Sequence, residues 1–226
     1  MKVAVLYSGG KDSNYALYLV MKQGLNIKYL LSIKSKRPDS YMFHIPCIDL
    51  TRQLADCIGI PLIQSHVSGI KEQEVDELKK IISKLEIDGI VSGSIASQYQ
   101  KSRIEKICNE LNLKSITPLW QRDPEKLLKE MIDLEFEIMI VGVAAHGLDK
   151  NWLGRVLDEK NFEELKKLGK SHGIHLSGEG GEYETIVLDG PIFKKKIEIE
   201  NYDILWHYSS GYIVVKEYKL TDKKNL

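Results

Sequence analysis

Short apolar runs alternate with amphipathic stretches over the first half of the chain, and this rhythm predicts strands separated by helices. Five apolar segments have the length of buried parallel strands, and they cover residues 2–7, 26–33, 61–63, 89–92 and 115–117. Residues 14–21 have the length of a helix and no breaker, and three further segments place apolar residues at helical spacing, at 48–58, 71–85 and 99–111. Strands and helices in this alternation form a parallel sheet covered on both faces, so the sequence predicts a doubly wound α/β fold.

The pattern changes near residue 120. Asp123, Pro124 and Glu125 form an acidic cap, a first-turn proline and a first-turn acid, which together begin a helix. A strand follows at 136–143, and a last helix is centred on 162–168. Beyond Gly173 the chain alternates in the manner of strands, at 185–188, 193–199, 204–206 and 212–218, and the polar tail from Thr221 is expected to fray. We therefore predict two domains, 1–120 and 121–226, of which the second is a smaller α+β domain.

Composition narrows the function classes. The chain has 226 residues, and its 32 basic and 32 acidic side chains give a formal net charge of zero, so nucleic acid is not an expected partner. No apolar run approaches the ~20 residues of a membrane helix. The chain starts directly with a strand pattern and no cleavable signal, so a cytoplasmic protein is expected. Cys47, Cys57 and Cys108 form no CxxC pair, which argues against a disulfide framework, zinc or an iron–sulfur cluster.

Residues 8–13, with the sequence SGGKDS, stand between the first predicted strand and the first predicted helix. The adjacent Gly9 and Gly10 let the backbone turn sharply and come close to a ligand. The free N–H groups at the helix start, with the positive end of the helix dipole, attract an anion. Ser8 and Ser13 add hydroxyl groups and Lys11 adds a positive charge. The spacing differs from GxxxxGK[ST], and the strand–turn–helix context favours a phosphate-binding loop over an ordinary turn.

A second unusual stretch is GEGGEYET at residues 178–185. It places Glu179, Glu182 and Glu184 within six residues, beside three glycines. If the chain is extended from Glu182 onward, Glu182 and Glu184 project from one face, with Tyr183 and Thr185 on the other. Carboxylates beside glycines can converge on a cation such as Mg²⁺, ammonium or a quaternary amine. Composition alone explains a solvated glycine hairpin with surface glutamates equally well.

The SGGKDS loop resembles the SGGxDS loop of the ATP pyrophosphatases, which cleave ATP between its α- and β-phosphates. Within that superfamily, GEGGEYET resembles a motif of the diphthine–ammonia ligase family. So does GSIASQYQ at 93–100, with Arg103, Glu105 and Cys108 on the helix behind it. The PLW sequence at 118–120 and SYMFH at 40–44 also fit, so the resemblance spans about residues 1–193.

This resemblance implies a fold, a reaction and its participants. The implied fold is an adenine-nucleotide α-hydrolase-like, Rossmann-like sheet with a smaller C-terminal domain, so 1–120 would bind ATP and 121–226 the substrate. The implied activity is the last step of diphthamide synthesis, an AMP-forming carbon–nitrogen ligase reaction that uses ATP and Mg²⁺. The carboxylate of diphthine on translation elongation factor two would be activated as an acyl-adenylate and amidated by ammonium, releasing AMP and pyrophosphate.

The resemblance also assigns residues to this reaction. ATP is expected to bind at Ser8, Gly9, Gly10, Lys11, Asp12, Ser13, Gly93 and Ser94. Substrate is expected to bind at Tyr99, Gln100, Arg103, Glu179, Gly180, Gly181, Glu182, Tyr183, Glu184 and Thr185. The expected catalytic residues are Lys11, Asp12, Glu182 and Glu184, and Asp12 is either a Mg²⁺ contact or a helix-start carboxylate. Tyr99, Trp120, Trp152 and Tyr183 are candidates for an aromatic face toward a quaternary amine, with core packing as the alternative. His44 and His146 are candidates for lining the cleft, again with a structural role as the alternative.

Two other functions stay open at this point. An ATP pyrophosphatase that modifies tRNA by thiolation would share the SGGKDS loop, but the zero net charge and isolated cysteines count against it. A non-catalytic nucleotide sensor would share the fold, but the lysine and the acids argue for turnover. The chain has no glutaminase domain, so free ammonium is the expected nitrogen source. The sequence leaves the oligomeric state open, with a homodimer as one option.

Overall fold

The structure is a computed structural model that describes residues 1–35 and 47–223. The predicted 40–44 motif, with His44, lies outside the described residues. The chain divides into two compact units. The first comprises Met1–Ser8, Asp12–Asp56 and Ile60–Trp120, and the second comprises Gly9–Lys11, Cys57–Gly59 and Gln121–Leu226. Three residues of the SGGKDS loop thus belong to the second unit.

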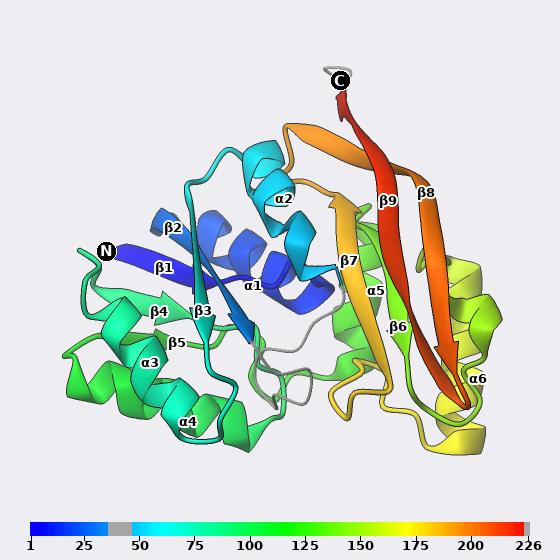
Figure 1. Ribbon diagram of the computed structural model, residues 1–226, viewed down its shortest axis with the longest axis horizontal. Coiled ribbons are helices and arrows are strands. Elements are labelled where there is room, and N and C mark those ends of the chain that lie inside the picture. The colour runs from blue at the N-terminus through cyan, green and yellow to red at the C-terminus, as the bar shows by residue number, and fades with distance from the viewer. Residues whose placement is uncertain (36–46, 224–226) are drawn as a thin grey trace. The chain divides into compact units, whose positions relative to one another are not determined.

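The first unit contains a five-stranded parallel sheet of order β3-β2-β1-β4-β5 (Figure 1). The strands are β1 (Lys2–Leu6), β2 (Asn26–Ser35), β3 (Leu62–Val67), β4 (Gly89–Val91) and β5 (Lys114–Ile116). The helices that connect them are α1 (Lys11–Lys22), α2 (Thr51–Ile58), α3 (Gln73–Ile82) and α4 (Gln98–Glu110), and a short 3₁₀ helix, η1 (Ile48–Leu50), precedes α2. The predicted doubly wound α/β fold is confirmed.

The core of the first unit follows from the two-residue period of its strands. Ala4 packs with Leu31 and Ile33 in a cluster that also contains the apolar stripes of α3 and α4, including Leu78 and Ile104. The alternate residues of β1 point to the opposite face of the sheet. Helices α1 and α2 lie on that face and α3 and α4 on the other (Figure 1). The central strands β1 and β4 are therefore buried, which explains their continuous apolar sequences, whereas the edge strands β3 and β5 are mostly half-buried or exposed.

The strand order places two motifs at one edge of the sheet. The chain winds from β1 to β2 and β3 in one direction, then crosses to β4 on the other side of β1. Ligands of open α/β sheets bind at the carboxyl ends of the strands where this direction reverses. Residues 7–10 follow β1 and residues 92–97 follow β4, so the topology brings the SGGKDS and GSIASQYQ motifs to that point.

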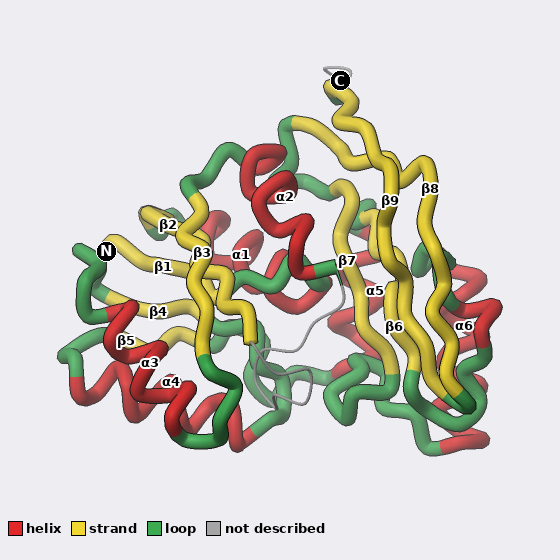
Figure 2. Tube along the Cα trace, viewed as in Figure 1, coloured by secondary structure: helices red, strands yellow, loops and turns green. Residues whose placement is uncertain are grey.

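The second unit is built on a four-stranded antiparallel sheet of order β7-β6-β9-β8. Its elements are α5 (Pro124–Asp133), β6 (Glu137–Val143), η2 (Lys150–Trp152), α6 (Glu159–His172), β7 (Tyr183–Asp189), β8 (Lys195–His207) and β9 (Ser210–Asp222). Figure 2 shows the long β8–β9 hairpin, which differs from the short parallel strands of the first unit. Strand β6 is buried from Ile138 to Val143.

The predicted helix start at Asp123 is confirmed. The carboxylate of Asp123 accepts hydrogen bonds from the backbone N–H groups of Glu125 (2.9 Å) and Lys126 (3.2 Å), and Pro124 occupies the first helical position. These bonds satisfy two N–H groups that have no partner within the helix. The sequence signal and the geometry agree here because an N-cap is a local feature.

Three sequence predictions differ from the structure. The two strands predicted at 193–199 and 204–206 form the single strand β8, with a register irregularity at Asn201 that absorbs the polar interruption. Helix α1 begins at Lys11, not at residue 14, so Lys11, Asp12 and Ser13 form its first turn. Strand β9 extends through Thr221 to Asp222, where fraying was predicted, because both residues pair with β8.

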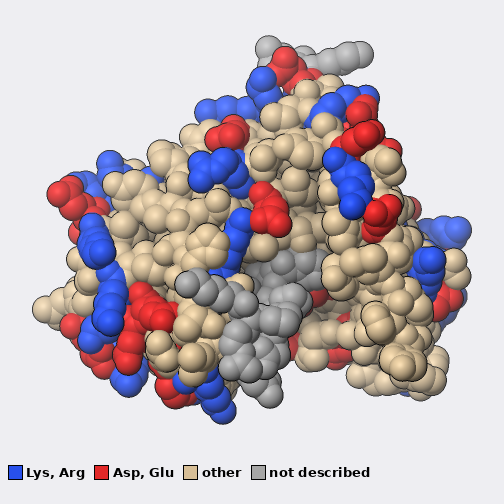
Figure 3. All heavy atoms as spheres, in the orientation of Figure 1, with Lys and Arg blue, Asp and Glu red and all other residues tan. Residues whose placement is uncertain are grey.

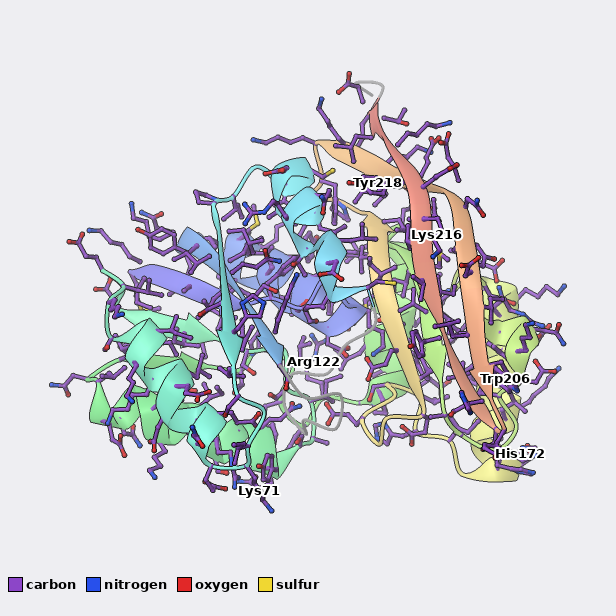
Figure 4. The ribbon with its side chains drawn as sticks, viewed as in Figure 1. Lys71, Arg122, His172, Trp206, Lys216 and Tyr218 are labelled. Atoms are coloured by element: carbon purple, nitrogen blue, oxygen red, sulfur yellow. The ribbon has the colours of Figure 1, made fainter. Side chains whose placement is uncertain are left out.

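Charged side chains on the β8–β9 hairpin pair across the strands and within β8. Lys219 contacts Glu198 (3.0 Å) and Lys196 contacts the same carboxylate (2.7 Å), and these two lysines lower the pKa of Glu198 to about 2. On the face drawn in Figure 3, basic and acidic side chains are interspersed. Near the turn of the hairpin, Trp206 donates its indole N–H to the carbonyl of Tyr208 at 3.0 Å (Figure 4).

In the described residues, no helix combines the length and the apolar character needed to cross a bilayer.

Candidate functional site

The SGGKDS loop leaves β1 and enters α1 through a glycine turn. Gly9 has φ +82°, a conformation that glycine adopts without a steric penalty. Its carbonyl accepts a hydrogen bond from the backbone N–H of Val187 at 2.9 Å, within the second unit. The hydroxyl groups of Ser8 and Ser13 lie 3.2 Å apart, and Ser13 Oγ also accepts from the Ser8 N–H at 3.4 Å. The loop therefore has a defined conformation that bends two hydroxyl groups toward each other.

The first turn of α1 supplies N–H groups to this loop. A hydrogen bond joins this part of α1 to the residue after β1, because the Tyr7 hydroxyl donates to the buried Asn14 Oδ1 at 3.0 Å. Asp12 lies in that first turn, where a carboxylate interacts favourably with the helix dipole. Magnesium ions in nucleotide sites are commonly held by one or two carboxylates together with the phosphates, so a single aspartate fits such an ion. In residues 1–35 and 47–223, no group of three or more histidine, cysteine or acidic side chains forms a metal site, and the Mg²⁺ contact of Asp12 stays a prediction.

The β4 loop packs directly against this helix start within the first unit. A Cβ atom at Gly93 would lie 2.8 Å from the carbonyl carbon of Asp12 and 3.0 Å from the Ser13 nitrogen. Only glycine allows the two backbones to approach so closely. Ser94 is buried, and its hydroxyl lies 2.8 Å from Ser92 Oγ and 3.5 Å from Gln100 Oε1. The structure thus brings together Asp12, Ser13, Gly93 and Ser94, which the sequence assigned to one nucleotide site.

The predicted substrate residues Tyr99 and Arg103 form a stacked pair on α4. The Arg103 guanidinium lies 3.4 Å from the Tyr99 ring centroid and donates to the Tyr99 carbonyl at 3.2 Å. Arg103 also pairs with Glu72, and the Lys71 ammonium lies 5.7 Å from the same ring (Figure 4). Burial raises the pKa of the Tyr99 hydroxyl. Two cations already face this ring, so electrostatic repulsion disfavours a quaternary amine there.

The other aromatic candidates are engaged in similar contacts. The Lys101 ammonium lies 4.9 Å from the Trp120 ring centroid. Trp152 is 5% exposed and packs beneath the Arg155 guanidinium at 4.6 Å, which favours the core alternative for this residue. His146 is exposed, and its ring centroid lies 4.9 Å from that of His172 on α6. A role for any of these three in substrate binding stays a prediction.

Lys11 is held by the GEGGEYET region, both belonging to the second unit. Its backbone N–H donates to Thr185 Oγ1 at 3.1 Å, and its ammonium donates to the Ser177 carbonyl at 2.5 Å. The ammonium also lies 5.3 Å from the Tyr183 ring centroid, and Lys11 is only 4% exposed. Two motifs that lie more than 160 residues apart in the sequence therefore meet at this lysine. Ser177 was missed by the sequence analysis because its contribution is a backbone carbonyl, and only its position next to Gly178 gave a hint.

The glutamates of GEGGEYET differ in their surroundings. The Glu182 carboxylate accepts hydrogen bonds from the backbone N–H groups of His175 (3.0 Å) and Gly180 (2.8 Å). Glu179 and Glu184 are half-buried. The predicted alternation is confirmed from Tyr183 to Thr185, since Tyr183 and Thr185 are buried on the face that contacts Lys11 and Glu184 is less buried. Strand β7 begins at Tyr183, so Glu182 lies outside it. The predicted catalytic or binding roles of the three carboxylates stay predictions.

The glycines of the same motif serve the loop's own geometry. Gly178 has φ +71°, and a Cβ there would lie 2.7 Å from the Tyr183 carbonyl oxygen. A Cβ at Gly180 would meet the Glu182 carboxylate at 2.8 Å. These glycines allow the loop to fold tightly around the Glu182 side chain.

A parallel sheet with a serine–glycine loop and a helix start at its switch point is the arrangement typical of nucleotide-binding α/β proteins. Comparison with known proteins makes this class more specific. The family model described as the diphthamide synthase N-terminal domain matches residues 1–115, and that of the diphthamide synthase C-terminal domain matches residues 123–221. The chain belongs to the diphthamide synthase family, so the resemblance predicted from the motifs is confirmed.

Curated relatives agree with the family models. A protein of Homo sapiens named diphthine–ammonia ligase is 36% identical over 238 residues, covering 95% of this chain and 89% of the relative. The protein of the same name from Schizosaccharomyces pombe is 34% identical over 239 residues, covering 96% of this chain and 39% of the relative. A solved structure titled as a predicted subunit of tRNA methyltransferase from Methanocaldococcus jannaschii has a TM-score of 0.50 at 19% identity. It covers 84% of this chain and 98% of the solved chain, and this likeness concerns the fold alone.

Proposed function

We propose that this chain is a diphthine–ammonia ligase, an ATP-dependent enzyme that amidates the diphthine carboxylate on translation elongation factor two. The observation that carries the proposal is the meeting of the SGGKDS loop with the start of α1 and the β4 loop at the switch point of the sheet. Relatives of that name cover 95% of the chain, so the proposal does not depend on an isolated motif. Residues 1–120 would bind ATP and residues 121–226 the modified protein, in the cytoplasm.

The chemistry requires activation of a poor acyl donor. A carboxylate has no good leaving group, so its oxygen attacks the α-phosphorus of ATP and the bond to the β-phosphate oxygen breaks. Pyrophosphate leaves with the electron pair, and the product is a mixed anhydride of diphthine and AMP. Ammonium first gives one proton to solvent or a nearby carboxylate. The resulting ammonia attacks the acyl carbon, AMP leaves with the electron pair of the acyl–oxygen bond, and the second proton, released on forming the neutral amide, also goes to solvent or a nearby carboxylate. No side-chain nucleophile is needed, so the enzyme works by positioning and by stabilising phosphate charge.

The residues of the loop suit the first step. The N–H groups of the first turn of α1 and the hydroxyl groups of Ser8 and Ser13 would hold the β- and γ-phosphates. Lys11 would neutralise the charge that develops on the departing pyrophosphate. Asp12 would hold Mg²⁺, which supplies further neutralisation of the triphosphate when bound. Gly93 and Ser94 would line the same phosphate site from the β4 loop.

Each unit separately offers contacts for the second substrate, at the α4 start in the first unit and in the GEGGEYET region in the second unit. Tyr99, Gln100 and Arg103 would contact the modified histidine or the surrounding protein. Glu179 and Glu184 would attract ammonium or the trimethylammonium group of diphthine, since both are cations. Nucleic acid is not part of this proposal.

The decisive experiment supplies ATP, ammonium and elongation factor two that carries diphthine. We expect AMP and pyrophosphate in equal amounts, and a mass change in the factor that matches replacement of a hydroxyl by an amine group. A Lys11→Met variant is the matched control, and we expect it to lower kcat by about 10²- to 10³-fold. Formation of ADP and orthophosphate would contradict the proposal. AMP release that needs tRNA in place of the factor would support the thiolation alternative.

A further inference from the structure

The loop from His175 to Glu182, here called the 175–182 loop, contains two consecutive turns. The Gly178 N–H donates to the His175 carbonyl at 2.8 Å, and the Gly181 N–H donates to the Gly178 carbonyl at 3.0 Å. Ser177, inside the first of these turns, is 3% exposed. Turns of this kind orient backbone carbonyl groups, and here one carbonyl points to a buried lysine.

The Glu182 carboxylate connects two parts of this loop through hydrogen bonds. Its Oε1 accepts from the His175 N–H at 3.0 Å and its Oε2 from the Gly180 N–H at 2.8 Å, so one carboxylate joins the two ends of the loop. The Glu182 carbonyl accepts from the Ala144 N–H at 2.9 Å, which anchors the loop next to β6. Backbone N–H bonds to an ionised carboxylate are stronger than those to a neutral acceptor, so the loop conformation depends on this charge.

The same loop presents its carbonyl to Lys11. The Lys11 ammonium donates to the Ser177 carbonyl at 2.5 Å. In the sequence, Ser177 lies between His175 and Gly180, whose N–H groups bind Glu182. Tyr183, next to Glu182, supports the contact from the other side, because its hydroxyl donates to the Leu176 carbonyl at 2.5 Å and its ring lies 5.3 Å from the ammonium. A shift of the 175–182 loop would therefore move the carbonyl that sets the position of Lys11.

We propose that Glu182 is a positioning residue for Lys11, and that it neither binds ammonium nor acts as a base toward it. Both of its carboxylate oxygens serve the loop, and the loop in turn holds the lysine of the phosphate site. The inference rests on the proposed function in one respect only, which is that Lys11 contacts the phosphates of ATP. It separates Glu182 from Glu179 and Glu184, for which cation binding remains the proposal.

A double-mutant cycle on ATP binding tests this inference. ATP with Mg²⁺ is titrated into the full chain by calorimetry without elongation factor, so the result does not depend on the ligase reaction. Glutamine at position 182 keeps one acceptor and turns an NH₂ group toward the second backbone N–H, which breaks that bond. We expect Glu182→Gln to weaken ATP binding about tenfold in the presence of Lys11 and to have no further effect in the Lys11→Met background.

The control and the contradicting outcomes are defined by the same titration. Glu200→Gln on β8, a carboxylate that pairs with Lys219 at 3.2 Å, should leave ATP affinity unchanged. Equal losses from Glu182→Gln in both backgrounds would overturn the inference, because the loop would then act independently of Lys11. Unchanged ATP affinity together with a raised KM for ammonium would also overturn it and would return Glu182 to the substrate site. If the Glu182→Gln protein does not fold, Glu182→Asp, which keeps the charge on a shorter side chain, replaces it in the cycle.

Discussion

Replacing Gly93 with alanine is expected to damage the proposed nucleotide site through a backbone collision. The added Cβ would lie 2.8 Å from the carbonyl carbon of Asp12, 2.9 Å from its oxygen and 3.0 Å from the nitrogen of Ser13. Ordinary contact begins at 3.4 Å, and all three atoms belong to the backbone of α1, so no side chain can rotate away. The first turn of the helix must move instead.

The magnitude follows from the nature of the collision. Overpacking of this kind costs about 1–3 kcal/mol of folding free energy. The displaced turn carries the N–H groups proposed to bind phosphate, and a hydrogen bond to a charged group contributes about 1.5–3 kcal/mol. Losing one such bond weakens ATP binding by about 10- to 100-fold. We expect both effects in Gly93→Ala, measured by urea denaturation and by ATP titration.

Gly24→Ala provides the matched control. Gly24 has φ +75° and nothing within 4 Å of an added Cβ, so its substitution costs about 1–2 kcal/mol through backbone strain alone. We expect a similar loss of stability in this variant with unchanged ATP affinity. A folded Gly93→Ala protein that binds ATP as tightly as the parent would refute the placement of phosphate against the start of α1.

Three further predictions concern stability and reactivity. Burial raises the pKa of Glu137 in the folded protein above its unfolded value, so ionisation of this carboxyl destabilises the fold as pH rises between the two values. Glu137→Gln should therefore increase the free energy of unfolding at neutral pH and leave it unchanged below about pH 4, as measured by urea denaturation at each pH. Burial raises the pKa of the Cys108 thiol to about 11 and Cys57 is fully buried, so a thiol reagent at about pH 8 should label Cys47 rapidly and the other two only after unfolding. A second fast thiol would contradict this. Asp123→Ala should lower stability by about 1 kcal/mol through loss of the α5 cap while ATP affinity stays the same, and an unchanged unfolding midpoint would show that the cap is dispensable.

Local patterns were sufficient for most of the first unit. The apolar runs at 2–7 and 89–92 and the stripe of Leu78 and its neighbours predicted strands and helices correctly. A buried parallel strand needs a continuous apolar run, and a helix that is buried on one side needs apolar residues at helical spacing. The SGGKDS motif was also legible, since a positive φ at Gly9 needs glycine. The β8–β9 hairpin was harder to predict, because the polar residues around Asn201 resemble a break between two strands. In the structure they belong to one strand, which continues past Asn201 with an irregular register.

The amino-acid sequence was enough to identify the fold class, the family and the loop that we propose holds phosphate. It identified the glutamates of GEGGEYET as unusual but could not say what each one contacts. Only the tertiary structure decided that Glu182 accepts two backbone N–H groups and that the Ser177 carbonyl receives the Lys11 ammonium. Every residue except proline carries the same backbone N–H and C=O groups. Which of these groups bind a distant side chain depends on how distant segments fold together, so the amino-acid sequence alone does not predict it.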